Sequence, residues 1–447
     1  MISMQTRIAL LMNWKNRDLR PCVQLSVILD KRGYQTRIIP HGPRTTPLAQ
    51  LRRFRPHFIV FPQVQGETKL VQYARKIGSR IIVLHTEGTW TPETAAGFYE
   101  RGLRLYGDEN PVELDLVWGE VMKNLLAENT NLDKSIIKVV GCPRFDVYKP
   151  PLSGLMMPRS EFSDRYGLSR KNPIIVWATN FVNLERTKRD LEYQKEFADR
   201  DMDEENAIQR SLRSKHLSAI MRLVREYPEC DFAIKLHPLE VPEYYETQLE
   251  QEKLEHRVAI INDITIEHVL NSASLFLNTN STSSTEAWFL GIPTVSLLFD
   301  ERARSKLSAF AAGNELVFDY DQLKATVDRV LAENYTPSTT LLNARAEFID
   351  KWFFKIDGKS TLRAAAEIDT HIQNHFSDKA INPVYSREVF IERFSSTIIY
   401  KTARKLYHKS HGTTSYWDKI REYDKLQEHE VEDLYQAVAK LYEGTEP

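Results

Sequence analysis

The composition of this 447-residue chain excludes several classes of protein. Hydrophobic residues make up 42% and charged residues 27%, which is ordinary globular usage and excludes a mainly disordered or fibrous chain. The 60 Lys and Arg residues against 61 Asp and Glu residues give a net charge of -1, so the overall charge does not favour nucleic acid as a partner. We expect no nucleic-acid partner, and any anion-binding site must be local.

Neither a membrane span nor a secretion signal is evident in the chain. No apolar run approaches the length of a span, and Arg7 leads into a short apolar strand without a signal-peptide cleavage pattern. The three cysteines Cys22, Cys142 and Cys230 are odd in number and far apart, which favours reduced thiols over a disulfide framework or a Cys-x-x-Cys metal site. We therefore expect a cytoplasmic protein.

In the first third of the chain, short apolar runs alternate with amphipathic stretches, which is the pattern of β-α-β units. Strands are predicted at 7–12, 35–40, 57–62, 80–85, 114–118 and 136–140, with helices at 23–31 and 69–77. Apolar strands that are separated by helices and buried on both faces form a parallel sheet.

The same pattern restarts after residues 149–158, whose Pro, Gly and Met content predicts a linker. Strands are predicted at 173–179, 231–236, 258–261, 275–278 and 294–298, helices at 267–272 and 284–290, and a long charged helix or helical insertion within 185–213. The chain is wholly helical after about residue 365. We predict an α/β fold with two doubly wound, Rossmann-like domains facing across a cleft, at 1–150 and 159–365, and a C-terminal helical segment at 366–447.

The strongest local signal is a hydroxyl-rich turn between a predicted strand and a predicted helix. Ser281, Thr282, Ser283 and Ser284 place hydroxyls and backbone N–H groups at a helix N-terminus, where the orphan donors and the helix dipole favour a phosphate. Plain helix capping is the alternative, because Ser and Thr cap helices widely. Four consecutive hydroxyls exceed what one cap needs, which favours anion binding.

A second signal is Lys235-Leu-His-Pro238, which ends an apolar strand at the edge where open α/β sheets bind ligands. His237 can there donate to a phosphate or protonate a leaving group, and Pro238 ends the strand. A His before a Pro is also common as a plain turn residue. The hydroxyl turn two strands later favours the functional interpretation.

Together these motifs are similar to the C-terminal half of GT-B glycosyltransferases, especially bacterial transferases that use CMP-activated sugars. The resemblance rests on Lys-x-His-Pro, the hydroxyl turn, Glu-Ala and Gly-x-Pro, and it implies that His237 and the turn hold the CMP phosphate. The residues implied in donor binding are Lys235, Asn180, Ser281, Thr282, Ser283, Ser284 and Glu286. The stretches 141–146 and 177–181 resemble surface carbohydrate biosynthesis proteins, so the matches span most of residues 80–300.

Bacterial sialyltransferases carry an acidic-acidic-Gly motif whose carboxylate takes a proton from the acceptor hydroxyl. The segment His85-Thr-Glu-Gly88 follows a predicted strand, so the resemblance implies that Glu87 is the catalytic base, although Thr86 replaces the first acid. A helix cap or an ion pair is the alternative for such an acid. The polar turn after the first strand makes Asn13, Lys15 and Arg17 candidate acceptor-binding residues, with an ordinary solvated loop as the alternative.

Two further features of the sequence bear on metals and membranes. Asp201 and Asp203 offer an Asp-x-Asp pattern, but they lie in the charged stretch and not after a buried strand, so we predict no metal. The basic, apolar-striped residues 386–411 suit anionic headgroups at the inner face of a membrane, and packing back on the two domains is the alternative.

The resemblance implies a metal-independent GT-B glycosyltransferase without a cofactor, which moves an acidic sugar (Kdo or a nonulosonic acid) from a CMP-sugar donor to a hydroxyl of a bacterial surface polysaccharide or a lipid-linked glycan. In an inverting mechanism Glu87 deprotonates the acceptor while His237 and the turn stabilise the departing phosphate. A retaining mechanism needs a carboxylate nucleophile instead. The alternatives are a CDP-glycerol or CDP-ribitol polyol-phosphate transferase, a nucleotide-sugar 2-epimerase on the same fold, and a non-catalytic subunit at the membrane.

Overall fold

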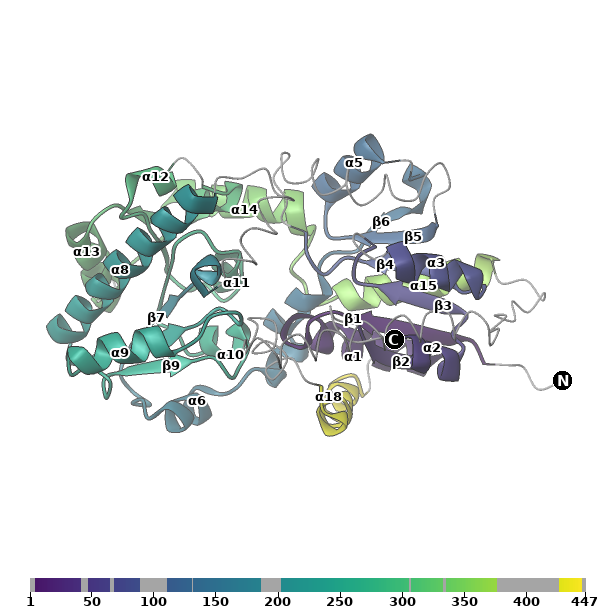
Figure 1. The fold of residues 1–447 in the computed structure, drawn as a ribbon, viewed down its shortest axis with the longest axis horizontal. Coiled ribbons are helices and arrows are strands. Elements are labelled where there is room, and N and C mark those ends of the chain that lie inside the picture. The colour runs from purple at the N-terminus through teal and green to yellow at the C-terminus, as the bar shows by residue number, and fades with distance from the viewer. Residues whose placement is uncertain are drawn as a thin grey trace, which may run out of the picture. The chain divides into compact units, whose positions relative to one another are not determined.

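The computed structural model describes residues 5–41, 47–64, 68–88, 111–130, 132–185, 202–304, 307–332, 335–375 and 426–443. The chain forms two compact units (Figure 1). The first comprises Met1–Leu155, Ile349–Thr413 and Asp424–Pro447, and the second comprises Met156–Phe348 and Thr414–Tyr423. The change from one unit to the other after Leu155 falls within the Pro- and Gly-rich stretch 149–158.

The first unit contains a six-stranded parallel sheet in the order β2-β1-β3-β4-β5-β6. Its strands are β1 (Arg7–Met12), β2 (Gln35–Pro40), β3 (Phe58–Phe61), β4 (Arg80–Leu84), β5 (Val112–Val117) and β6 (Ile137–Val139). Ile8 pairs with Thr36 on one side and with Phe58 on the other. Because β1 lies between β2 and β3, the carboxyl ends of β1 and β3 flank the point where the strand order reverses, and ligands of open α/β sheets bind at such points.

Helices from both ends of the chain cover one face of this sheet. Alternate strand side chains such as Leu10, Val60 and Leu116 form one core with α1 (Lys15–Lys31), α15 (Ser360–His375) and α18 (Glu428–Leu441). The remaining helices of the unit are α2 (Leu48–Phe54), α3 (Thr68–Lys76) and α5 (Glu120–Asn129), with short 3-10 helices at Lys134–Ile136, Pro143–Tyr148 and Leu152–Leu155. The first unit therefore uses C-terminal helices to complete its core.

Asp146, the last residue of the motif 141–146, holds the start of α15. Its carboxylate accepts hydrogen bonds from the backbone N–H groups of Ser360 (2.9 Å) and Thr361 (2.7 Å) and from Thr361 Oγ1 (2.7 Å). The first N–H groups of a helix have no partner within the helix, so a carboxylate there stabilises it. Burial raises the pKa of Asp146 even though these donors favour its charged form. This motif residue therefore has a structural role.

The second unit contains another six-stranded parallel sheet, in the order β12-β11-β10-β7-β8-β9. Its strands are β7 (Ile174–Ala178), β8 (Asp231–Lys235), β9 (Val258–Ile261), β10 (Leu275–Asn278), β11 (Thr294–Leu297) and β12 (Glu315–Val317). The strand order reverses between β7 and β10, so their carboxyl ends flank the second ligand-binding position of this kind.

The two faces of the second sheet are buried against different helices. Ile175 and Trp177 pack with α8 (Met202–Glu226), α9 (Glu243–Gln251) and α13 (Tyr320–Leu331). Ile174 and Val176 point to the other face and pack with α6 (Arg159–Tyr166), α10 (Ile266–Leu270) and α11 (Ser283–Phe289). Further helices are α12 (Glu301–Arg304) and α14 (Thr339–Phe353), with 3-10 helices at Val182–Glu185 and Ala309–Gly313. Burial on both faces explains why these strands are continuously apolar.

The predicted α/β fold with two doubly wound parallel sheets is confirmed, and the eleven predicted strands all occur, whereas the edge strand β12 was not predicted. The charged helix expected within 185–213 is α8, which begins at Met202 and continues to Glu226; residues 186–201 and 386–411 lie outside the described residues. None of the described helices is long and apolar enough to cross a membrane.

Candidate functional site

Three polar segments follow the central strands of the second sheet at its carboxyl edge. Thr179 and Asn180 follow β7, the turn that begins at Thr279 follows β10, and His237 comes after β8. The strand order places β7 between β10 and β8, so the hydroxyl turn and His237 lie on either side of the segment after β7. The backbone N–H of His237 donates to Thr179 Oγ1 at 3.2 Å, which links two of the three segments directly.

His237 is held in one tautomer by the backbone that follows it. The N–H of Leu239 donates to His237 Nδ1 at 3.2 Å, so Nδ1 acts as an acceptor. A neutral imidazole whose Nδ1 accepts a hydrogen bond carries its proton on Nε2. The proton of the half-buried ring is therefore on Nε2, and an N–H donor is the group that phosphate binding or protonation of a leaving group requires.

Lys235 lies beneath the edge of the sheet. Its side chain is buried, and its Nζ donates to the carbonyl oxygen of Leu236 at 2.8 Å. Burial lowers the pKa of Lys235 to about 8, although the carboxylates of Asp263, Glu267 and Glu240 favour its charged form. The amine of Lys235 is thus held in the interior, and its role in donor binding stays a prediction.

The hydroxyls of the turn fall into two groups that the sequence does not distinguish. Ser281 Oγ and Ser283 Oγ are 2.7 Å apart, and the Ser283 N–H donates to Ser281 Oγ at 3.3 Å. Thr282 is exposed and Ser281 is half-buried. Ser283, in contrast, is buried and keeps 9% of its surface exposed. The helix that follows, α11, has only 7 residues, so its dipole adds less than the sequence suggests.

Ser284 belongs to a buried hydrogen-bond network beneath the turn. Its hydroxyl donates to Asn278 Oδ1 at 3.0 Å and accepts from Asn314 Nδ2 at 3.1 Å. Asn278 Nδ2 donates to the Val295 carbonyl at 3.1 Å, and Asn278 Oδ1 also accepts from the Ser281 N–H at 3.3 Å. Both Asn278 and Ser284 have no exposed surface (0%). The network contains polar groups that the sequence analysis did not select.

Asn314 joins this network to the rest of the second unit. Its Nδ2 also donates to Ser296 Oγ at 2.9 Å, and its Oδ1 accepts from Trp288 Nε1 at 2.9 Å. Neighbouring Gly313 allows the close approach of Trp288, because a Cβ at that position would lie 2.5 Å from Trp288 Cζ2. No local motif marks Asn314, since its partners come from two other elements, α11 and β11.

His216 approaches the same turn from α8. This fully buried side chain places Nδ1 3.4 Å from Thr279 Oγ1 and packs edge-on against Trp177 and Phe299. Burial lowers the pKa of His216 to about 3, so the ring is neutral at physiological pH. Of the other predicted donor-site residues, Glu286 is buried in α11 and Asn180 is exposed after β7. Their ligand contacts stay predictions.

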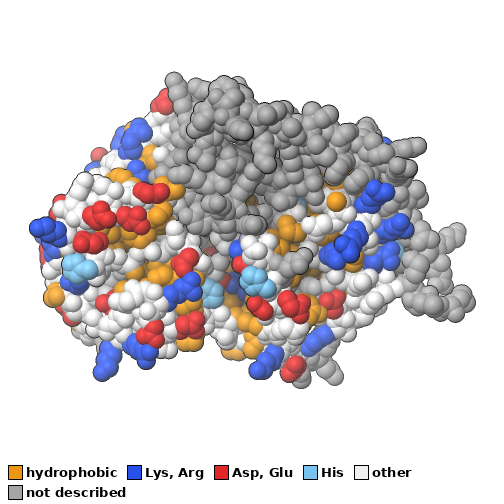
Figure 2. Space-filling view, turned by 60° about the horizontal axis from the view of Figure 1, so that its bottom comes forward, with side chains coloured by type: hydrophobic (Ala, Val, Ile, Leu, Met, Phe, Trp, Pro, Cys, Tyr) orange, Lys and Arg blue, Asp and Glu red, His pale blue; other side chains and the backbone are white. Residues whose placement is uncertain are grey.

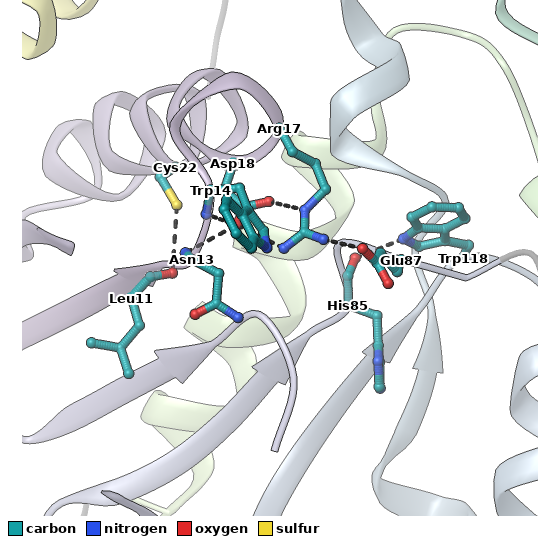
Figure 3. Close-up of polar contacts among 9 residues, drawn as sticks. All are labelled: Leu11, Asn13, Trp14, Arg17, Asp18, Cys22, His85, Glu87 and Trp118. Carbon is teal, nitrogen blue, oxygen red and sulfur yellow. Dashed lines mark hydrogen bonds and ion pairs between the residues drawn. The ribbon is translucent and has the colours of Figure 1, made fainter. Parts of the chain in front are cut away.

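In the first unit the predicted base Glu87 belongs to a charged cluster after β1 and β4 (Figure 3). Arg17 pairs with Glu87 and also contacts both oxygens of Asp18, with Nε–Oδ1 at 2.5 Å and Nη2–Oδ2 at 3.0 Å. Burial works against the charge of Arg17, but Asp18 and Glu87 outweigh it and raise the pKa of Arg17 above its usual value. The Glu87 side chain is 53% exposed, and it therefore remains accessible to solvent.

Asp18 is the buried centre of this cluster. Its Oδ2 accepts the backbone N–H groups of Asn13 and Trp14, both at 3.0 Å, and it has no exposed surface (0%). Arg17 is consequently an ion-pair partner of Asp18. Lys15 pairs with Glu430 of α18 at 2.7 Å. The structure thus gives two of the predicted acceptor residues, Lys15 and Arg17, structural partners, and Asn13 is buried in the turn that Asp18 holds.

A second polar pair lies next to Glu87. His85 Nε2 is 2.9 Å from Asp115 Oδ1 on β5, and Trp118 Nε1 donates to the His85 carbonyl at 2.7 Å. The imidazole of His85 and the carboxylate of Glu87 point in different directions (Figure 3). Both members of the pair are buried, so it supports the end of β4 from inside the sheet.

The described residues contain no cluster of side chains of the kind that binds a metal ion. No group of three His, Cys, Asp or Glu side chains in this part of the chain is placed to hold a metal ion. Acidic, basic and hydrophobic side chains are mixed over the coloured part of the face in Figure 2. The three cysteines are free thiols, two of them buried.

No protein-family model and no curated protein matches this chain. Solved structures do match. A UDP-N-acetylglucosamine 2-epimerase from Methanocaldococcus jannaschii shares 16% identity, with a TM-score of 0.51 over 82% of this chain and 100% of the other. A protein from Listeria monocytogenes assigned to the same activity shares 13% identity, with a TM-score of 0.54 over 84% and 98% of the two chains. S. aureus MnaA in complex with UDP shares 11% identity, with a TM-score of 0.51 over 83% and 98%.

These matches support the resemblance at the level of the GT-B-like fold and overturn its finer part. The prediction of a glycosyltransferase that uses a CMP-sugar donor and a glycan acceptor is wrong, because the similar structures are 2-epimerases and a UDP complex and not CMP-sugar transferases. The physical reason is that a His at a strand end and a hydroxyl turn are suited to a nucleotide phosphate. They carry no information about the base or about the group transferred.

Proposed function

We propose that this protein is a nucleotide-sugar 2-epimerase that acts on a sugar activated by uridine diphosphate. One observation carries the proposal: His237 and the hydroxyl turn end strands on either side of β7, in a fold shared with UDP-N-acetylglucosamine 2-epimerases. Neighbouring strands are about 4.8 Å apart, so β8 and β10 are separated by roughly 10 Å. Side chains that reach inward from both strands can contact one diphosphate.

The chemistry of these groups suits a diphosphate that is bound without a metal. Nε2–H of His237 and the hydroxyls of Ser281 and Ser283 are donors, and hydrogen bonds to a charged phosphate oxygen are stronger than those between neutral groups. In this proposal the donors hold the nucleotide while the sugar reacts.

Inversion at C2 of the sugar needs a group that takes the C2 proton while a C1=C2 double bond forms and UDP leaves C1, and a group that returns a proton to the other face of C2 as UDP adds back to C1. Glu87 is our candidate for proton transfer, because its carboxylate is half-exposed and Arg17 holds it at the end of β4. The role of Arg17 is then to position Glu87 as well as to neutralise Asp18.

The proposal is tested by incubating the protein with UDP-N-acetylglucosamine in D₂O and following C2 by NMR. We expect the 2-epimer to form with deuterium at C2, because breaking and remaking the C2–H bond exchanges the proton with solvent. His237→Gln should weaken UDP binding measured by calorimetry. Glu87→Gln should slow turnover by about 10²- to 10⁴-fold with little change in UDP affinity.

Calorimetry with UDP, CDP and CMP on the same preparation tests the nucleotide. Tighter binding of CMP or CDP than of UDP would reject the uridine assignment. Binding of UDP without epimer formation or deuterium incorporation would reject the reaction while leaving the nucleotide site in place.

A further inference from the structure

The hydroxyl group of Ser284 differs from its neighbours in what it can still offer to a ligand. A hydroxyl has one proton to donate, and Ser284 directs its proton to Asn278 Oδ1. Its oxygen meanwhile accepts from Asn314 Nδ2. Ser284 therefore has no proton left for a phosphate oxygen unless the buried network opens.

Ser281 and Ser283, in contrast to Ser284, keep a hydroxyl proton that a ligand can accept. Their two hydroxyls have two protons, and the hydrogen bond between them uses one, whichever residue donates. The second proton of the pair can point to a ligand, and the backbone N–H of Ser283 supports the pair from within the turn. Ser281 is half-buried, and Ser283, although buried, keeps 9% of its surface exposed against 0% for Ser284.

Asn278 and Asn314 decide where this pair of hydroxyls is held. Asn278 connects β11 to the turn, because one amide group contacts Val295, Ser281 and Ser284. Asn314 fixes Ser284 from the opposite side and is itself held by Trp288. All polar atoms of the two amides that are named here have partners, and a fully satisfied buried network has one preferred arrangement.

We propose that Asn278, Ser284 and Asn314 are positioning residues, which hold the turn 279–283 so that Ser281 and Ser283 donate to the nucleotide phosphates. The inference rests on the proposed function, since the ligand is the diphosphate of that site. It separates four consecutive hydroxyl residues into those that contact the ligand and one that supports them.

Adjacent Ser283→Ala and Ser284→Ala variants form a matched pair for the test, because each removes one hydroxyl from the same helical turn. Three quantities are measured on each: affinity for UDP and for inorganic pyrophosphate, melting temperature, and amide hydrogen exchange across residues 279–283. Ser283→Ala should weaken both ligands by about 10-fold or more and leave melting and exchange unchanged. Ser284→Ala should weaken both by a similar factor, lower the melting temperature and speed exchange in the turn.

Two results for Ser284→Ala would overturn the proposal. Wild-type affinity with a lowered melting temperature would mean that the network only supports the fold. Weakened affinity with unchanged exchange would mean that Ser284 contacts the ligand directly. If Ser284→Ala does not fold, Ser284→Cys keeps a weak donor of similar shape and should show the same changes in smaller degree.

Pyrophosphate keeps this test separate from the test of function. A wild-type protein that binds pyrophosphate but not UDP would refute the uridine assignment, and the matched pair would still report on positioning. A wild-type protein that binds neither would refute the ligand role of the turn and this proposal together.

Discussion

In each sheet a buried side chain holds the turn beside the point where the strand order reverses, and the two side chains differ in chemistry. In the first unit, the carboxylate of Asp18 accepts the N–H groups of Asn13 and Trp14 after β1. In the second unit, the amide of Asn278 accepts the N–H of Ser281 after β10. We call Asp18 and Asn278 the anchors of these turns. Both are fully buried, so each supplies the hydrogen-bond acceptor that water would otherwise provide to the backbone N–H groups of its turn.

The difference lies in what each anchor demands of its surroundings. A buried carboxylate needs a counter-charge, and Arg17 provides it for Asp18. A neutral amide needs none, so Asn278 holds the turn after β10 without adding a negative charge beneath it. Since a carboxylate at that place would repel a phosphate, the amide anchor is the one compatible with an anionic ligand. The charged anchor belongs to the unit that carries the candidate proton carrier Glu87.

Breaking the charged anchor should have the largest effect on stability. Asp18→Ala removes one partner of a buried ion pair, leaves Arg17 with Glu87 alone and leaves two backbone N–H groups without their acceptor, which should cost about 3 to 5 kcal/mol of unfolding free energy. Urea denaturation measures this. Glu87→Gln is the control, because its half-exposed carboxylate should change stability by less than about 1 kcal/mol. Equal effects of the two variants would contradict the central role given to Asp18.

Exchanging the chemistry of the anchors tests the comparison directly. Asn278→Asp introduces a buried carboxylate in the second unit at a side chain whose hydrogen bonds go to Val295, Ser281 and Ser284 and not to an arginine. We expect a loss of about 2 to 4 kcal/mol at pH 7.5. The burial of this carboxyl raises its pKa in the folded state above the unfolded value, so stability should be regained as the pH falls towards 5.

Ligand binding is the second measurement made on Asn278→Asp. The carboxylate should weaken pyrophosphate binding at pH 7.5 and much less at pH 5, as isothermal calorimetry can show. Asn278→Ala is the control, since it removes the amide without adding charge and should show no such recovery on acidification. A pH-independent loss in both variants would mean that charge beneath the turn is irrelevant.

How far sequence could anticipate these features depends on the range of the interactions. The strands were predictable because burial on both faces leaves continuous apolar runs such as β7, whereas β12 is 3 residues long, partly exposed and carries little signal. Ser284 could not be separated from Ser283, because its partner Asn314 lies 30 positions away. The burial of Asp18 was equally unpredictable from the sequence, since a polar residue in the first turn of a helix is normally exposed. The nucleotide was predicted wrongly because a phosphate motif does not specify the base.

Each unit also contains a neutral buried histidine, and acid should expose the difference between the two. Burial lowers the pKa of His216 to about 3 and that of His57 to about 4. Because the folded pKa lies below the unfolded value near 6.5, stability is full above that pH and is lost as the pH falls towards the folded pKa. His216→Leu should remove about 2 kcal/mol of the difference in stability between pH 7 and pH 5. His57→Leu should remove a similar amount over this range, because both folded pKa values lie below 5, and a smaller amount below pH 4, where the His57 ring becomes protonated in the folded protein. Denaturation curves at both pH values measure this, and an unchanged pH dependence in His216→Leu would contradict it.

The smallest expected effect concerns the exposed ion pair of the first unit. Lys15 Nζ pairs with Glu430 Oε1 at 2.7 Å where solvent reaches both side chains, whereas Arg17, two positions along the same helix, pairs with fully buried Asp18. Solvent screens the first pair, so Lys15→Met should cost less than about 1 kcal/mol, and most of that cost should disappear in 0.5 M NaCl. Lys31→Met is the matched control. Lys31 also links α1 to the end of α18, but its Nζ donates to a carbonyl, that of Tyr442 at 2.7 Å, and not to a carboxylate. The cost of Lys31→Met should therefore depend less on salt. If Lys15→Met destabilises the protein by several kcal/mol at high salt, the pair is shielded from water, and the distinction between a buried and an exposed ion pair on this helix fails.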